Sequence, residues 1–306
     1  MQFVITEQEN GKTVRDFLKM QGVSAALGAK LKRMPQGIVL NGTRVTVRAV
    51  LKTGDKLVLA VEDEAKNEKL LPLEAAVDIV LETSDFLVVN KPPFMPTHPS
   101  HGHFCDTLAN ALVWHYGDTP NFRPRFVNRL DRNTSGAVLV AKHALSAAKL
   151  SDAMARGEIK KTYYAVVCGT IQKETVLKTG IRRQTESIIF REVCAESEGD
   201  LAITHVMPLC TKNGYTLVQL APETGRTHQL RVHLAHIGAP IVGDELYGAA
   251  SPLIARHALH AAELSFPLPN GGETVWVFTP IASDMATLIT KIFGREVAQS
   301  LAGSKK

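Results

Sequence analysis

Residues 128–140 read Asn-Arg-Leu-Asp-Arg-Asn-Thr-Ser-Gly-Ala-Val-Leu-Val, so a polar segment that ends in glycine leads directly into an apolar strand. Within it Asp131 stands between Arg129 and Arg132, and nearby positive charge favours the ionised form of a carboxyl group. Two interpretations fit these residues equally well. The segment is either a catalytic loop that carries a carboxylate, or a salt-bridged turn whose polar side chains bond its own backbone.

Short runs of apolar and β-branched residues surround this segment, at 79–81, 86–89, 137–140, 163–167 and 215–220. A helix is predicted over 143–156, where apolar residues recur at helical spacing and Gly157 ends the pattern. A second helix is predicted after the turn at 222–225, with Leu230, Leu234 and Ile237 facing the core. Because strands outnumber helices and do not alternate regularly with them, we expect an α+β domain around a mixed, largely antiparallel sheet.

The first 60 residues predict a small α+β module. Thr13 and Ser24 are suited to cap two helices, and the second helix ends before Pro35. One face of the first helix carries Val14, Phe17 and Leu18. The pair Asn41-Gly42 fits a type I′ hairpin turn, and a further strand is expected at 57–61.

The polar stretch at 62–69 interrupts the apolar pattern and is predicted to be a linker. It divides the chain into a domain at 1–65 and a larger one at 66–306.

Positive charge is concentrated in the N-terminal part of the chain. The whole sequence has a net charge of +5, whereas residues 1–60 alone carry ten Lys and Arg against four Asp and Glu. An excess of this kind indicates a polyanionic partner. The residues best suited to phosphate oxygens follow the second predicted helix or lie within it: Lys30, Lys32, Arg33, Arg44 and Arg48.

Several classes of protein are disfavoured by what the sequence lacks. The four cysteines form no CxxC pair, so neither a disulfide scaffold nor a four-thiolate zinc site is expected. The N-terminus shows no export signal and no apolar run is long enough to cross a membrane. No glycine-rich nucleotide-binding motif opens a helix. We therefore expect a cytoplasmic protein without membrane contact, and nothing in the sequence demands more than a monomer.

Four sequence blocks together resemble the RluA family of RNA pseudouridine synthases. The first is R-L-D-x-x-T-S-G at 129–136, and the second is the K-T-Y-Y-A-V-V-C-G strand at 161–169. The third is G-R-T-H-Q-L-R-V-H-L at 225–234 with G-D at 243–244, and the fourth begins L-H-A at 259–261. The resemblance covers about residues 78–282 in family order, and it implies the pseudouridine synthase fold.

The resemblance also implies a reaction. Pseudouridine formation breaks the N1–C1′ bond of a uridine, turns the base and joins C5 to C1′. The family's catalytic aspartate corresponds to Asp131, which either attacks C1′ or removes the C2′ proton, and the sequence leaves both routes open. No cofactor is implied.

Other site residues follow from the same resemblance. Arg231 corresponds to the arginine that pairs with the catalytic aspartate, and Tyr163 to the tyrosine at the base pocket. The target base must leave its stack, and Arg129 or Arg132 is expected to fill the vacated space or to hold a flanking phosphate. Leu130 and Leu230 are expected in the pocket wall. Two positions depart from the family, because Asn128 replaces a common histidine and Phe94 replaces a glycine.

The N-terminal helices, the I-V-L-N-G-x-x-V stretch and the later G-D resemble an S4-like RNA-binding domain. Relatives with such a domain suggest large-subunit ribosomal RNA as the substrate, with transfer RNA as an alternative. A non-catalytic ribosome-assembly factor on the same fold is the second functional hypothesis.

Two further hypotheses use residues near the same segment. His98, His101, His103 and Cys105 include the side-chain types that bind zinc, but their spacing matches no site with a clear geometric basis, so no metal is predicted. A hydrolase triad of Ser135, His228 and Asp131 is conceivable, but Ser135 lacks the turn that exposes a nucleophile.

Overall fold

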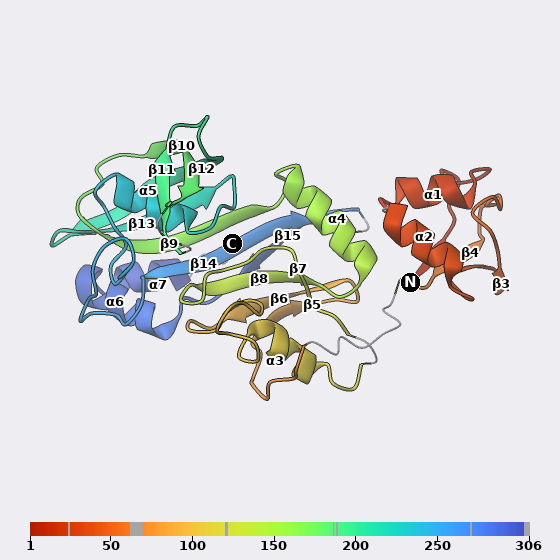
Figure 1. Ribbon diagram of the computed structural model, residues 1–306, viewed down its shortest axis with the longest axis horizontal. Helices are drawn as coiled ribbons and strands as arrows, with labels where there is room; N and C mark the ends of the chain where they lie inside the picture. The colour runs from red at the N-terminus through yellow and green to blue at the C-terminus, as the bar shows by residue number, and fades with distance from the viewer. Residues whose placement is uncertain are drawn as a thin grey trace.

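The computed structural model describes residues 1–23, 25–61, 70–119, 122–185, 187, 189–269 and 271–302 (Figure 1). Within these residues no helix is both long and apolar enough to span a membrane. All four cysteines are free thiols. Ser24, the predicted cap, and the predicted linker at 62–69 lie outside the described residues.

The N-terminal module (residues 1–61) packs two helices on a small antiparallel sheet with strand order β1-β4-β2-β3. Its elements are β1 (Gln2–Val4), α1 (Val14–Met20), α2 (Ala25–Arg33), β2 (Ile38–Leu40), β3 (Thr43–Arg44) and β4 (Lys56–Leu59). The Thr13 hydroxyl accepts a hydrogen bond from the Asp16 N–H, which confirms the predicted cap. Asn41 and Gly42 have φ angles of 49° and 82°, as a type I′ turn requires.

The larger part of the chain forms an 11-stranded sheet with helices packed against it. Along the sheet the order is β11-β10-β12-β13-β9-β14-β8-β6-β5, with β15 paired to β14 and β7 to β8. The pair β8–β14 is parallel and the other pairs among the described strands are antiparallel. The expected α+β class with a mixed, largely antiparallel sheet is confirmed.

The strands and helices of this part run as follows. The first half contains β5 (Ile79–Glu82), β6 (Phe86–Lys91), α3 (Leu108–His115), β7 (Arg125–Phe126), β8 (Ser135–Ala141), α4 (Ala144–Ala155) and β9 (Lys160–Cys168). The second half contains β10 (Thr175–Arg183), β11 (Arg191–Cys194), β12 (Asp200–Lys212), β13 (Tyr215–Pro222), α5 (Gln229–His236), β14 (Leu259–Pro267), β15 (Thr274–Phe278), α6 (Ser283–Phe293) and α7 (Arg295–Ala302).

Strand β8 is buried on both faces, which explains its continuous apolar sequence. On one face Ala137, Leu139 and Ala141 pack in a cluster with Leu150 and Ala153 of α4. On the other face Val138 and Val140 join the main core, which also contains Leu108 and Leu112 of α3. The segment that precedes β8 is therefore attached to the most enclosed strand of the sheet.

Two predictions about helices have different outcomes. The predicted helix at 143–156 is α4, which His143 caps and which ends before Gly157 at φ 71°. Leu230 and Leu234 of α5 are buried as predicted, but Ile237 is 37% exposed and the prediction for it was wrong. Since Ile237 is the C-cap of a helix that ends at His236, its side chain no longer follows the buried face.

The N-terminal module contacts α4. Leu145 of this helix is fully buried in the module's own apolar cluster, which includes Phe17 and Leu18 of α1. Nearby, Nζ of Lys149 donates a hydrogen bond of 2.9 Å to the side-chain oxygen of Gln21. Helix α4 thus packs both on the large sheet and on the module.

Gly136 begins the passage from the polar segment into β8, and the structure leaves no room for a side chain there. Its φ is 111°, and a Cβ would lie 2.1 Å from the Ala261 carbonyl oxygen of the parallel neighbour β14. Gly136→Ala is therefore expected to lower the free energy of unfolding by at least ~3 kcal/mol, since strain and a backbone clash add. Gly157 also has a positive φ but has open space around it, so Gly157→Ala should cost only about 1 kcal/mol. Urea unfolding of both variants tests the difference, and equal losses would contradict it.

Candidate active site

The loop that carries Asp131, between β7 and β8, is fixed from both sides. The Thr97 hydroxyl donates to the Leu130 carbonyl at 2.8 Å and accepts from the Leu130 N–H at 3.2 Å. The Asn128 side chain donates to the Ala137 carbonyl of β8 at 3.1 Å. Its amide oxygen also accepts a backbone N–H of β8 at 2.7 Å. Asn128 therefore ties the start of the loop to β8.

Lys91, at the end of β6, lies beneath this loop and is fully buried. Its ammonium donates three hydrogen bonds to backbone carbonyls, those of Pro92 at 2.7 Å, Met95 at 2.8 Å and Arg132 at 3.2 Å. One cation thus ties the 92–95 turn to the Asp131 loop. Burial, helped by the charge of Arg256, lowers the pKa of Lys91 to about 7.

Arg256 supports the other end of the loop and is also almost fully buried. Its guanidinium binds both carboxylate oxygens of Asp284, at 2.7 and 2.9 Å. The remaining donors reach the Asn133 carbonyl at 3.0 Å and the Ser135 hydroxyl at 3.1 Å. Since Asp284 lies in α6, this arginine connects the loop to the C-terminal helices.

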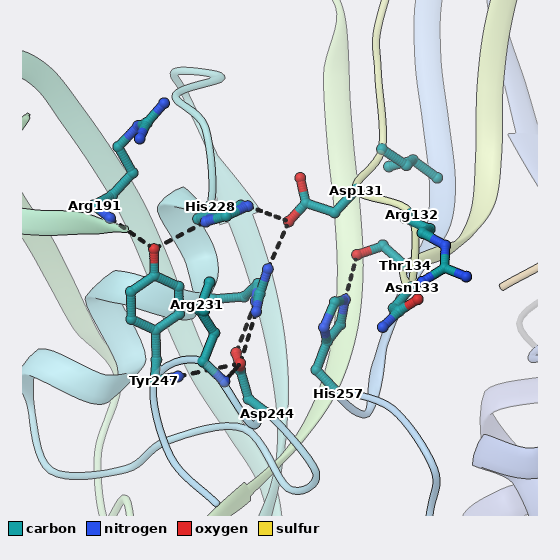
Figure 2. Close-up of polar contacts among 12 residues, drawn as sticks. Asp131, Arg132, Asn133, Thr134, Arg191, His228, Arg231, Asp244, Tyr247 and His257 are labelled. Atoms are coloured by element: carbon teal, nitrogen blue, oxygen red, sulfur yellow. Dashed lines mark hydrogen bonds and ion pairs between the residues drawn. The ribbon is translucent and has the colours of Figure 1, made fainter. Parts of the chain in front are cut away.

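Arg231 of α5 faces the carboxylate of Asp131 (Figure 2). Its Nη1 lies 3.3 Å from Oδ2 of Asp131. Its two other nitrogens bind both oxygens of Asp244 at 2.7 Å each. The bidentate partner is therefore Asp244, which is buried, and Asp131 shares the same guanidinium through a single longer contact.

The surroundings of Asp131 favour its ionised form. Burial alone would raise the pKa of this carboxyl group, but its electrostatic interactions with His228 and Arg231 outweigh burial and hold the pKa below its usual range. Nε2 of His228 lies 3.9 Å from Oδ2 of Asp131. The carboxylate keeps 23% of its side-chain surface exposed. At neutral pH Asp131 is therefore a charged group that a substrate can reach.

A pocket of about 800 Å³ opens at this carboxylate, within the range of cavities that enclose small ligands. Tyr163 of β9 lies in its wall and is 8% exposed. Burial, with the negative charge of Asp131 nearby, raises the pKa of Tyr163, so its hydroxyl remains protonated. The predicted site residues that line the pocket are Arg129, Leu130, Asp131, Tyr163, Leu230 and Arg231.

Other predicted residues lie elsewhere. Arg132 is exposed and does not line the pocket, and its carbonyl bonds Lys91. The five basic residues of the N-terminal module lie in α2, β3 and the loop that follows. Nη2 of Arg44 donates to the Lys32 carbonyl at 3.4 Å, which brings these two backbone regions together. The roles of all these residues stay predictions.

The structure assembles neither the hypothetical zinc site nor the hypothetical hydrolase triad. In the part of the chain that the structure describes, no group of three or more His, Cys, Asp or Glu residues could hold a metal ion. His103 instead pairs with Asp106 at 2.6 Å, and Cys105 is exposed. The Ser135 hydroxyl is buried against Nδ1 of His260 at 2.9 Å, so it does not form a triad with His228.

Four residues of the site had no predicted role. Asp244 stood in a quoted sequence block, but only the fold brings it to Arg231. Tyr247 follows it closely, and its ring lies 5.2 Å from the guanidinium carbon of Arg231. Lys91 and Arg256 support the loop partly through backbone carbonyls, and residue type alone does not predict such contacts.

Comparison with known proteins gives a consistent result. Residues 85–236 match the family described as RNA pseudouridylate synthase. A Bacillus subtilis protein named uncharacterized RNA pseudouridine synthase YjbO is 39% identical over 279 residues, which cover 90% of this chain and 98% of that protein. The Pseudomonas aeruginosa ribosomal large subunit pseudouridine synthase D is 32% identical, with 83% of each chain covered. The solved structure of human RNA Pseudouridylate Synthase Domain Containing 1 has a TM-score of 0.57 and 30% identity, covering 75% of this chain and 96% of that one.

Lys91 gives the site a testable pH dependence. Its pKa is about 7 in the folded protein and about 10.4 in an unfolded chain, so the unfolded state binds more protons between these values. The free energy of unfolding should therefore rise with pH over this interval. Lys91→Met removes this contribution and should flatten the rise, which urea unfolding at pH 7, 8 and 9 measures. Lys173→Met, at an exposed position, serves as the control. Equal slopes of unfolding free energy against pH for the wild type and Lys91→Met would contradict the lowered pKa of Lys91.

Proposed function

This chain belongs to the RluA family of RNA pseudouridine synthases, which are isomerases, and we propose that it converts specific uridines of large-subunit ribosomal RNA with Asp131 as catalytic residue. The observation that carries the proposal is the geometry of Asp131. Arg231 and His228 both approach Oδ2, and no described residue hydrogen-bonds Oδ1. One oxygen is anchored and the other is available to a substrate in the pocket.

The side chains around the pocket fit the parts of a uridine. The ionised Asp131 either attacks C1′ or removes the C2′ proton, and the uracil leaves as an anion in both routes. The ring of Tyr163 supplies a flat apolar surface against which the detached base can turn. When C5 joins C1′, either the bond from Asp131 to C1′ breaks or C2′ regains its proton; C5 then loses its proton and N1 gains one, so the product is an isomer of the substrate. Leu130 and Leu230 complete the wall, and none of these steps calls for a redox cofactor.

Arg129 is assigned to the flipping step. It is exposed at the pocket rim, two residues before Asp131. From there its guanidinium is suited to replace the extruded base or to bind a flanking phosphate. Arg132, which lies outside the pocket, is assigned a phosphate contact.

Large-subunit ribosomal RNA is proposed as the substrate for two reasons. The Pseudomonas relative is named for that RNA. The N-terminal module resembles an S4-like RNA-binding domain, and its basic residues suit a structured RNA. Transfer RNA is tested in parallel below. We assign the module to 1–65 and the catalytic domain to 66–306, in a monomeric cytoplasmic enzyme.

The catalytic assignment is tested by release of tritium from C5 of labelled uridine in ribosomal and transfer RNA transcripts. Asp131→Asn should lower the rate by on the order of 10³-fold or more, because it removes the reacting carboxylate. RNA affinity should change little. Asp118→Asn, in an exposed turn after α3, is the matched control and should keep full activity. Tight RNA binding by a wild-type protein that releases no tritium would instead support the non-catalytic assembly factor.

The binding assignment is tested by the salt dependence of RNA affinity. If Lys32 and Arg48 each neutralise one phosphate, the double alanine variant should bind more weakly. The slope of log affinity against log salt should then flatten by roughly 1.4, at ~0.7 per single-strand contact. Lys173, in the loop between β9 and β10, and Lys212, at the end of β12, do not line the pocket and provide the control pair. An unchanged slope would exclude Lys32 and Arg48 from the RNA interface.

A further inference from the structure

Asp131 stands at the end of a chain of contacts that begins on β11. The backbone N–H of Arg191 donates to the hydroxyl oxygen of Tyr247 at 2.9 Å, and the same oxygen lies 2.9 Å from Nδ1 of His228. The second imidazole nitrogen, Nε2, faces Oδ2 of Asp131 at 3.9 Å. Figure 2 shows these residues in sequence from Arg191 to Asp131. The reaction described above gives no task to Tyr247 or His228.

The hydrogen bonds of Tyr247 determine which nitrogen of His228 carries the proton. Because Tyr247 accepts the hydrogen bond of Arg191, its own O–H can donate to Nδ1 of His228. Nδ1 is then the acceptor, and the proton resides on Nε2. The other tautomer would direct the Nε2 lone pair at an ionised carboxylate, which is unfavourable. Burial lowers the pKa of His228 below its usual range, so the ring is neutral near pH 7 and its tautomer matters.

The backbone at His228 is adapted to this orientation. His228 has φ 58°, in the left-handed region, and it is the N-cap of α5 without any side-chain capping bond. Such a conformation costs a non-glycine residue roughly 1 kcal/mol or more. Its imidazole bonds Tyr247 in place of the helix backbone. As a result His228 and Arg231, three residues apart, both reach Oδ2 of Asp131.

We propose, on the basis of the isomerase function above, that His228 is a positioning residue for Asp131. Tyr247 sets its tautomer, and Nε2–H then holds Oδ2 beside the guanidinium of Arg231, so that Oδ1 is turned towards the ribose of the bound uridine. The 3.9 Å separation exceeds a hydrogen bond, and contacts of this kind shorten when substrate closes the site.

The other charged and titratable groups around Asp131 belong to separate elements. They are Arg231 of α5 with its partner Asp244, Tyr163 of β9, Lys91 of β6 and His257 before β14. Tyr247→Phe leaves these groups in place. It also keeps the aromatic ring that lies over Arg231, so the substitution isolates the hydroxyl.

The tautomer is tested without RNA by ¹H–¹⁵N NMR of histidine-labelled full-length protein at pH 7. The signal that disappears in His228→Gln identifies His228. We expect the Nε2–H tautomer in the wild type and loss of that preference in Tyr247→Phe. A wild-type Nδ1–H tautomer would overturn the inference.

The positioning role is tested by kinetics on the transcript that releases tritium. Tyr247→Phe should lower kcat by on the order of 10- to 100-fold with KM within about twofold, since misplacement of a reacting group acts on the chemical step. His228→Gln, whose amide N–H has no tautomers, should retain more activity than His228→Leu. Adding Tyr247→Phe to His228→Gln should then cost nothing further.

Two results separate the inference from the function on which it rests. The positioning role would be overturned if Tyr247→Phe lowered kcat equally in the wild type and in His228→Gln, or if Tyr247→Phe kept full activity. The isomerase function would stand in both cases. Failure of the wild type to release tritium would refute the isomerase function itself. Tyr215→Phe, at the far end of β13 and outside the pocket, is the control for loss of a hydroxyl and should leave kcat unchanged.

Discussion

The active site depends on one buried guanidinium that two carboxylates share. Asp244 takes the bidentate face of Arg231, and this nearly water-free pair fixes the direction of the third nitrogen. Without Asp244 the buried Arg231 would keep only its longer contact to Asp131, and most of its charge would be uncompensated. Arg231 makes only one contact to Asp131, and at 3.3 Å it is longer than the two contacts to Asp244. The Asp131 carboxylate is therefore anchored through one oxygen and stays ionised. The proposed catalytic residue is thus held in place by a buried ion pair of two other side chains.

A second constraint acts from below the loop. Lys91 and Arg256 donate to the backbone carbonyls of the two residues that follow Asp131, Arg132 and Asn133. Carbonyl acceptors make the loop's shape independent of most of its side chains. The arrangement explains why a polar and solvent-accessible loop can hold one geometry, since both supporting cations are shielded from water.

The sequence predicted those parts of the molecule that local chemistry determines. The Thr13 cap, the type I′ turn and the glycine-ended helix α4 follow from neighbouring residues, and they were found. Strands β10 and β12 were missed because their alternating, partly polar residues become strands only by pairing with each other and with β13. In the site, Asp131, Tyr163 and Arg231 came from motifs, and the structure gathers them around one pocket. Asp244 and Tyr247 could not be assigned, because only the tertiary fold brings them to Arg231.

The double packing of α4 has a consequence for the size of a good substrate. Leu145 lies in the core of the N-terminal module, while Met154 and Ala155 of the same helix line the pocket. A rigid helix therefore sets the span between the N-terminal module and Asp131. Under the proposed function, an RNA that is long enough to touch both gains a high effective concentration at its second contact, whereas a short oligonucleotide that reaches only one does not. In that case selectivity for large folded RNA follows from molecular length as well as from base recognition.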